Sequence, residues 1–222
     1  MTKNYKFLTF ITIFFVTILL VSNIVSTKLV DLGIFIFDAG TLLFPLSYIF
    51  SDVLTEVYGY KETRKVIWMG FVSTILLSAI IIIVGILPGA SERTYQADYN
   101  NILGLTPRIV TASLIAYLFG EFSNSYIMAK VKIKMQGKML WVRTIGSTII
   151  GEFFDTIIFV LIAFAGIYDN ELIKNIIISN YVFKVGVEIL FTPITYIIIN
   201  KLKKSEQEDY YDNKTNFNPI KL

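Results

Sequence analysis

Six segments of the chain consist mainly of apolar residues, and their lengths are close to what a bilayer-crossing helix requires. A transmembrane helix needs about 20 consecutive apolar residues to cross roughly 30 Å of hydrocarbon. These segments cover residues 7–27, 39–58, 66–87, 109–129, 144–168 and 173–199. The second is the least hydrophobic, and the third carries no charge and stops before Pro88. The pattern predicts an all-α, polytopic membrane protein with a bundle of six transmembrane helices.

The composition agrees with a single membrane domain. Hydrophobic residues make up 55% of the 222 residues, and the mean hydropathy is +0.64. A soluble domain of this length would expose too much apolar surface. The first apolar run continues past the usual length of a signal peptide and lacks a small-residue cleavage site. We therefore expect the first helix to be retained.

Basic residues are divided unequally between the connecting segments, which predicts the orientation because cytoplasmic loops are enriched in Lys and Arg. One alternating set of segments contains Lys3, Lys6, Lys61, Arg64, Lys65, Lys130, Lys132, Lys134, Lys138, Arg143, Lys201, Lys203 and Lys204. The other set contains Lys28, Arg93, Arg108 and Lys174. The bias predicts that both termini are cytoplasmic. Residues 1–200 would form the transmembrane domain, and residues 201–222 a short polar cytoplasmic tail.

The sequence contains no Cys and no His. Disulfides, thiolate metal sites, haem ligation by His and imidazole proton relays are therefore excluded. The net charge of +3 gives no reason to expect binding to nucleic acid. We predict neither a cofactor nor a metal site, and polar chemistry is left to carboxylates, Lys, Arg, Tyr and amides.

Ionisable residues nevertheless occur inside the predicted helices, where each costs about 2.5–3.5 kcal/mol on insertion scales. The acids are Asp52, Glu56, Glu121, Glu152, Asp155 and Glu188, and they face one central base, Lys184. Their spacings of three or four residues place Tyr48, Asp52 and Glu56 on one helix face, Glu152 and Asp155 on a second, and Lys184 and Glu188 on a third. We expect these faces to meet inside the bundle, because lipid would not tolerate them.

Two interpretations of these residues stay open. In the structural one, Lys184 pairs with Glu188 or Asp155, and Glu56 reaches the interface to meet Arg64 or Lys65. In the functional one, the surplus of acids is balanced by a proton, a cation or a solute rich in hydrogen-bond donors. Pro45 and Pro193 would free backbone carbonyls inside the membrane, as at transporter sites.

The segment from Phe44 to Arg64, FPLSYIFSDVLTEVYGYKETR, resembles the signature of the queuosine precursor transporter family, also described as vitamin-uptake-transporter-like. Other pieces are similar to the same family in the same order: residues 23–28, 143–147 leading to Asp155, Lys184 with 192–193, and 211–219. The resemblance implies a membrane transporter, not an enzyme, that imports 7-deazaguanine precursors of queuosine across the cytoplasmic (inner) membrane of a prokaryote.

A deazaguanine presents a ring N–H beside an exocyclic amine, and one carboxylate can accept both hydrogen bonds. The candidate substrate-binding residues are Asn23, Lys28, Tyr48, Asp52, Glu121, Asn124, Arg143, Glu152, Asp155, Lys184 and Glu188. We expect Asp52 to contact the solute or a coupling proton, and Tyr48 or Phe154 to support its ring. Glu56 would act as a gate that closes the cytoplasmic end against Arg64 or Arg143.

Three other classes of function compete with this one. The strongest is a substrate-binding membrane subunit of a vitamin importer that separate ATPases energise, since the chain has no P-loop motif of its own. An intramembrane acid–base enzyme is disfavoured because no nucleophile triad is recognisable. A purely structural protein would not need so many buried acids. The partners expected are the lipid bilayer and a nucleobase-like solute, with a coupling proton or cation and a homodimer left open.

Overall fold

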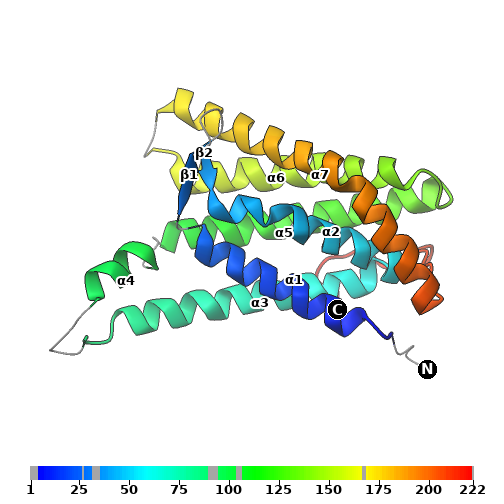
Figure 1. Ribbon diagram of the computed structural model, residues 1–222, viewed down its shortest axis with the longest axis horizontal. Coiled ribbons are helices and arrows are strands. Elements are labelled where there is room, and N and C mark those ends of the chain that lie inside the picture. The colour runs from blue at the N-terminus through cyan, green and yellow to red at the C-terminus, as the bar shows by residue number, and fades with distance from the viewer. Residues whose placement is uncertain are drawn as a thin grey trace.

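The computed structural model describes residues 5–26, 28–31, 36–89, 95–103, 107–166 and 169–221, and most of them are helical (Figure 1). The elements in chain order are α1 (Leu8–Val25), β1 (Leu29–Asp31), β2 (Ile36–Asp38), η1 (Ala39–Leu42), α2 (Phe44–Val53), η2 (Leu54–Tyr58), α3 (Tyr60–Gly85), α4 (Gln96–Ile102), α5 (Pro107–Lys134), α6 (Leu140–Phe164) and α7 (Asn170–Glu206).

All six predicted segments are helical, with differences at their ends. Two of the predicted ends, at residues 27 and 168, lie outside the described residues. Helix α3 begins six residues before the predicted start, and α7 continues to Glu206. The apolar run marks the part of a helix that lies in hydrocarbon, whereas charged turns at either end remain helical in water. Two features were not predicted: the short helix α4, and an antiparallel hairpin in which Val30 pairs with Phe37.

The second predicted helix is divided into three pieces. A 3-10 turn, η1, ends at Leu42, and α2 then begins with Pro45 in its first turn, where a missing N–H costs nothing. The helix continues as the π-helical segment η2 and ends at Gly59, whose φ of +85° a residue with a side chain would rarely adopt. Pro45 therefore starts a helix instead of interrupting one. π-helical turns occur frequently at functional sites.

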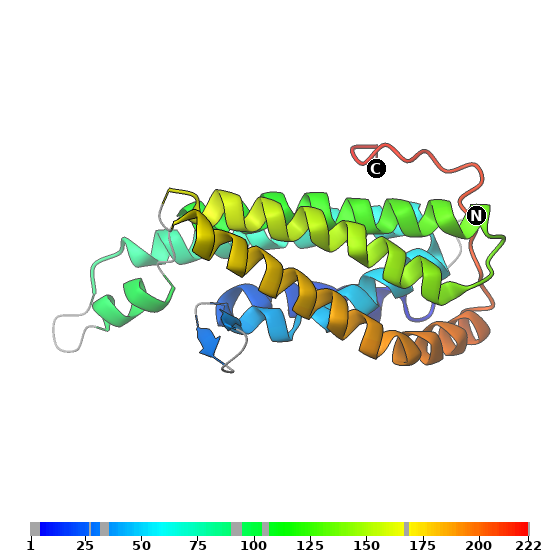
Figure 2. The same cartoon turned by 90° about the horizontal axis from the view of Figure 1, so that it is seen from above.

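Helices α5 and α6 pack against each other along most of their length (Figures 1 and 2). Gly120 and Gly151 lie at this contact, because a Cβ added at Gly151 would stand 3.1 Å from the carbonyl oxygen of Gly120. Small residues let membrane helices approach closely. The approach brings Asn124 of α5 and Asp155 of α6 into the interior of the bundle, where both are buried.

Many polar side chains point inward and many large apolar ones outward, unlike the distribution in a soluble protein. On α3, an exposed stripe spaced by three or four residues consists of Met69, Val72, Leu76, Ile80 and Ile83. Among the described residues, four helices are long and apolar enough to cross a membrane: α1, α3, α6 and α7. Helix α5 and the segment formed by η1, α2 and η2 lie among them and carry many of the buried polar groups.

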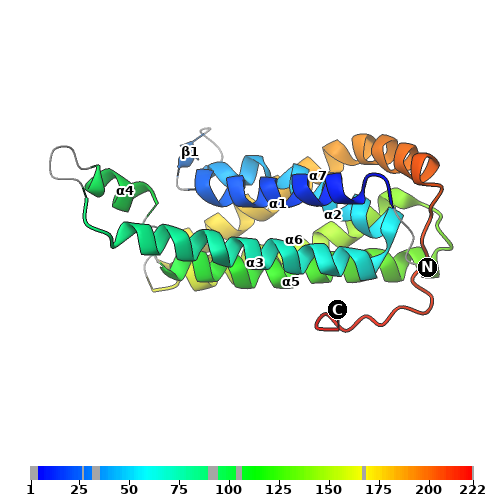
Figure 3. The same cartoon turned by 90° about the horizontal axis from the view of Figure 1, so that it is seen from below.

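The two ends of the bundle differ. Residues 5–8 and the segment 206–221 lie at one end, here called the terminal end, where Glu206 accepts hydrogen bonds from the backbone N–H groups of Lys6 and Phe7 at 2.9 and 2.7 Å. The hairpin and α4 lie at the opposite end, here called the distal end (Figures 1 and 3). A buried apolar cluster that includes Phe15, Val53 and Ile199 joins α1, α2 and α7.

Candidate functional site

A cavity of about 630 Å³ extends from the distal end into the middle of the bundle. Small-molecule sites usually have volumes of about 300–1,000 Å³. On α3, α6 and α7 the lining residues run from the distal ends of the helices to Thr74, Asp155 and Lys184, and none lies nearer to the terminal end. The cavity therefore ends halfway through the bundle. Its inner limit is formed by Tyr48, Glu121, Asp155 and Lys184, which we call the polar floor.

Glu121 and Asp52 are held by neighbours on the helix opposite. The Ser51 hydroxyl of α2 donates a hydrogen bond to Glu121 Oε2 of α5 at 2.6 Å. The Asn124 amide of α5 donates to Asp52 Oδ1 of α2 at 3.0 Å. Ser51 and Asp52 are adjacent on α2, while Glu121 and Asn124 are three residues apart on α5, so two consecutive polar contacts fix the helices against each other.

Lys184 pairs with both acids of α6. Its Nζ lies 2.8 Å from Asp155 Oδ2 and 3.1 Å from Glu152 Oε2. The predicted pairing with Asp155 is present, whereas Glu188, one turn further along α7, is not a partner of Lys184 in any ion pair among the described residues. Both carboxylates of α6 are thus neutralised by a single ammonium group.

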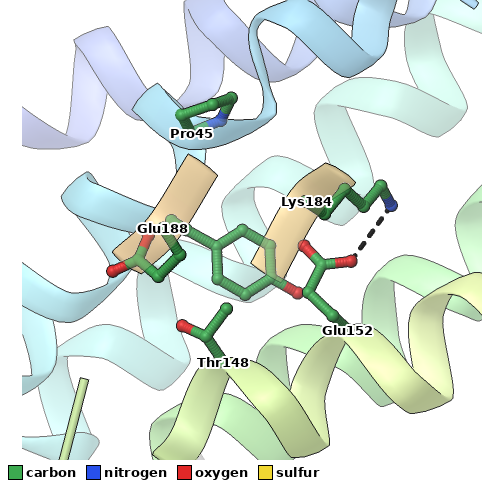
Figure 4. Close-up of a pocket in the computed structure, with 6 residues that line it drawn as sticks. Pro45, Thr148, Glu152, Lys184 and Glu188 are labelled. Atoms are coloured by element: carbon green, nitrogen blue, oxygen red, sulfur yellow. Dashed lines mark ion pairs between the residues drawn. The ribbon is translucent and has the colours of Figure 1, made fainter. Parts of the chain in front are cut away.

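A second, much smaller void lies beside the polar floor, and Figure 4 shows the side chains around it. Its volume of about 10 Å³ is close to the minimum that holds one water molecule. The lining residues are Pro45, Tyr48, Thr148, Glu152, Lys184 and Glu188. Tyr48 and Lys184 also line the large cavity, so they separate the two spaces. Glu188 is 1% exposed, and neither of its carboxylate oxygens has a hydrogen-bond partner among the described residues.

Glu56 occupies the terminal end, surrounded by three cations. Arg143 approaches its two carboxylate oxygens at 2.7 and 3.2 Å, Lys203 lies 2.6 Å from Oε1, and Lys132 lies 3.4 Å from Oε1. Glu56 itself is fully buried. We call these four residues the latch. Arg143, one of the two predicted partners, is therefore in contact with Glu56, whereas Arg64 instead donates to the backbone carbonyls of Asn216 and Asn218.

The segment after α7 covers the latch. Asp209 lies 2.5 Å from Lys132 Nζ and 2.8 Å from Lys203 Nζ, and the N–H of Tyr210 donates to the carbonyl of Val57 in η2. Partial burial by itself would raise the pKa of Asp209, but hydrogen bonds and charge from Lys132 and Lys203 outweigh it and hold the pKa below its ordinary value. The tail is thus joined to the latch by charge as well as by the backbone.

The candidate residues from the sequence are distributed over the large cavity, the small void and the latch, and four of them lie in none of these. Tyr48, Glu121, Asp155 and Lys184 form the polar floor, and Asn23 lines the large cavity further out. Glu152 and Glu188 line the small void, while Asp52 and Asn124 are buried but line neither space. Arg143 belongs to the latch, and Lys28 is exposed near the distal end, away from both spaces. Phe154 is 41% exposed and lines neither space.

Several residues of the site were missed by the sequence reasoning. Lys132 and Lys203 were counted only as loop charges, yet Lys132 is 2% exposed and contacts Glu56, Asp209 and Tyr210. Their position at the ends of apolar runs gave no sign of burial. Asn180 lines the large cavity with its Oδ1 unpartnered among the described residues. The sequence could have identified Asn180 as a candidate, since an amide in the middle of an apolar run is energetically costly in a membrane.

Comparison with known proteins identifies a family to which this sequence is similar. The family described as "Putative vitamin uptake transporter" matches residues 38–198. A "Probable queuosine precursor transporter" of Bacillus subtilis is 31% identical over 187 residues, which cover 84% of this chain and 82% of that protein. The "Queuosine precursor transporter" of Escherichia coli is 25% identical over 91% of each chain. No solved structure matches this chain.

Proposed function

This chain belongs to the family described as vitamin uptake transporters, and we propose that it imports 7-deazaguanine precursors of queuosine. Two curated relatives that it matches over most of their length are named as transporters of queuosine precursors. These names favour a transporter that acts on the solute directly over a subunit of an ATPase-driven importer. The chain would be a multi-pass protein of the cytoplasmic (inner) membrane.

The observation that carries the proposal is a cavity that is open to one half of the bundle and blocked in the other. The 630 Å³ cavity ends at the polar floor, and the terminal end beyond it is sealed by the buried ion pairs of Glu56. A solute that entered from the distal side would stop at the floor until the latch opened. Such a state would be one half of an alternating-access cycle, in which gates on the two sides open in turn.

The residues that line the cavity suit a flat ring that carries two hydrogen-bond donors and one hydrogen-bond acceptor. Glu121 and Asp155 line the cavity, and either carboxylate could accept the ring N–H and exocyclic amine of a deazaguanine. The amide N–H of Asn180 is suited to the carbonyl oxygen of the ring. Tyr117 and Phe159 supply aromatic faces on the walls. We assign the solute contact to Glu121 and Asp155 instead of Asp52, which is paired with Asn124 outside the cavity.

For the membrane topology we propose six spans. The four long apolar helices, together with α5 and the segment of η1, α2 and η2, would each cross the bilayer, with the terminal end in the cytoplasm. The latch lysines and Arg143 lie at this end, as the bias of basic residues toward the cytoplasm requires. A phosphatase that is active only outside the cytoplasm, fused after residue 222, should be inactive; activity would contradict the topology.

The function is tested by deleting the gene and feeding labelled 7-deazaguanine precursors one at a time. Queuosine in transfer RNA should disappear in the deletion strain, return with the wild-type gene, and stay absent with Glu121→Gln. Normal amounts of queuosine in the deletion strain at submicromolar precursor would contradict import by this protein. Recovery of an ATPase module bound to the purified protein would favour the importer subunit instead.

A further inference from the structure

Glu188 takes part in no ion pair among the residues that the structure describes. It is 1% exposed, and neither Oε1 nor Oε2 accepts a hydrogen bond from a described residue. Lys184, one turn away on α7, is directed to Asp155 and Glu152 instead. A buried carboxylate without a cation or a donor costs several kcal/mol, and taking up a proton removes that cost. The environment of Glu188 therefore suits the neutral acid in this conformation.

Asp52 is in a similar position on α2. It is fully buried, and only one of its oxygens, Oδ1, accepts a hydrogen bond, from Asn124. Its Oδ2 has no partner among the described residues. Three acids act on Asp52, from α7, α5 and η2: Glu188, Glu121 and Glu56. Two adjacent carboxyl groups that share no cation cannot both be ionised in a dry interior.

The void in front of Glu188 admits a proton carrier and excludes the solute. Its volume of about 10 Å³ is close to the minimum for one water molecule, whereas a deazaguanine needs the large cavity. The charged groups that line the void with Glu188 are Glu152 of α6 and Lys184 of α7 (Figure 4). Tyr48 of α2 also lines the void and adds a hydroxyl. Because Tyr48 and Lys184 also border the large cavity, a proton can pass from the solute side to Glu188 through the floor.

We propose that Glu188 and Asp52 form a proton-binding site that couples import of the solute to inward flow of protons. The inference rests on the proposed transport function. On the distal side, hydronium gives one proton to the Glu188 carboxylate, which leaves a carboxylic acid and water. On the terminal side, once the latch has opened, the acid returns the proton to water and becomes a carboxylate again.

Lys184 links the proton to the solute. It and Glu188 are four residues apart on α7, the spacing at which side chains of a helix meet, and both border the same void. While Glu188 is neutral, Lys184 stays on Asp155 and Glu152, as in this structure. When Glu188 loses its proton after the solute has left, the new carboxylate draws Lys184 away from Asp155, which alters the polar floor. The empty protein then returns with Lys184 and Glu188 paired, ready for another proton.

The chemistry favours a proton over a metal cation. Among the residues that the structure describes, no cluster of three or more acidic, His or Cys side chains is arranged to hold a metal ion. Glu188 and Asp52 contribute two carboxyl groups, and the void leaves space for about one water. A sodium ion would need about five or six oxygen ligands, as hard cations generally do.

The test uses the full-length protein in liposomes that contain the pH-sensitive dye pyranine. Adding 7-cyano-7-deazaguanine outside should acidify the lumen with wild-type protein, and an acid-outside pH gradient should raise accumulation of the labelled solute at least tenfold. A sodium gradient should have no such effect. If the lumen is not acidified, or if a sodium gradient and not a pH gradient drives accumulation, the proposed proton site is wrong, whatever the results with the variants described next.

Two variants of α7 locate the site. Glu188→Gln should reduce the accumulation driven by a pH gradient at least tenfold. The same variant should reduce counterflow, which is the exchange of labelled for unlabelled solute without a gradient, less than threefold. Glu171→Gln, the same change at an exposed position of α7, should match wild type in both assays. Equal losses in the two assays, or no loss in either, contradict the assignment to Glu188. No counterflow by wild-type protein overturns the transport function itself, and the proton site with it.

Discussion

Replacing Glu56 by Gln removes the negative charge around which Arg143, Lys132 and Lys203 are gathered. Arg143 is 1% exposed and Lys132 is 2% exposed, so both would remain buried as cations. Removing one partner of a buried ion pair costs about 3–5 kcal/mol. We take the lower limit, about 3 kcal/mol, because Asp209 continues to pair with Lys132 and Lys203. At about 1.4 kcal/mol for each factor of ten, the ratio of open to closed latch should rise about 100-fold.

The change in latch opening can be followed by cysteine labelling, because the natural sequence contains no Cys. Ser147 lies on α6 between Arg143 of the latch and Glu152 of the small void, and it is fully buried. In a Ser147→Cys protein, the reaction with N-ethylmaleimide requires the terminal end to open. Glu56→Gln in this background should accelerate the reaction by one to two orders of magnitude. Solute binding should survive, because the polar floor does not include Glu56.

A control separates the latch from a general effect of lost charge. Glu62 is at the same end of the bundle, but it pairs with Lys65 at the surface, where an ion pair contributes about 0.2–1 kcal/mol. Glu62→Gln should leave the labelling rate of Ser147→Cys within a few-fold of the parent. If Glu56→Gln labels no faster than Glu62→Gln, the ion pairs of Glu56 do not hold the terminal end closed.

Three further changes test other parts of the site. Asp155→Asn should reduce uptake more than tenfold while the protein still inserts, because an amide cannot accept hydrogen bonds through both of its heteroatoms and no longer balances Lys184; wild-type uptake would show that Asp155 is idle. Tyr48→Phe should change counterflow little and Tyr48→Ala should abolish it, since the ring separates the two spaces; equal effects would contradict this role. Removal of residues 207–222 should accelerate labelling of Ser147→Cys several-fold. Because the pKa of Asp209 is lowered, its contribution to holding the latch closed is complete above about pH 5 and is lost only as the pH falls through the lowered value. The ratio of labelling rates between the truncated and the full-length protein should therefore be the same at about pH 5.5 and pH 8.

The helices were predictable from the sequence because the requirement for apolar length is strong and local. The pattern identified all six segments and the inward position of Asp52, Glu152 and Glu188. It did not predict how the second segment is divided, because a 3-10 turn, an α-helix and a π-turn have the same apolar composition. Pro45 marks the start of α2 and Gly59 the end of η2, but neither Pro nor Gly stands at the junction of α2 and η2, and both residue types also occur in continuous membrane helices.

The partners of the charged residues were less predictable than their burial. The sequence left open whether Lys184 pairs with Glu188 or with Asp155, and in the structure Asp155 and Glu152 of α6 are the partners. The choice depends on how α6 and α7 pack against each other, which the spacing of residues within one helix does not show. The latch was only half predictable for the same reason: Arg143 was expected, while Lys132, Lys203 and Asp209 come from segments whose charges look like ordinary cytoplasmic ones.

The membrane interior has more acidic than basic residues, whereas the latch has more basic than acidic residues. The order of these two groups along the bundle has a consequence for transport. The membrane interior holds five acids against Lys184, as Asp52, Glu121, Glu152, Asp155 and Glu188 are all buried there. The latch holds Arg143, Lys132 and Lys203 against Glu56 and the partly exposed Asp209. A proton or a donor-rich solute is attracted to the first group and repelled by the second. Charge in a buried region is screened weakly, so this repulsion acts on any proton that would leave while the latch is closed. The cations that seal the terminal end against the solute thereby also oppose a proton leak, and both barriers are removed together when the latch opens.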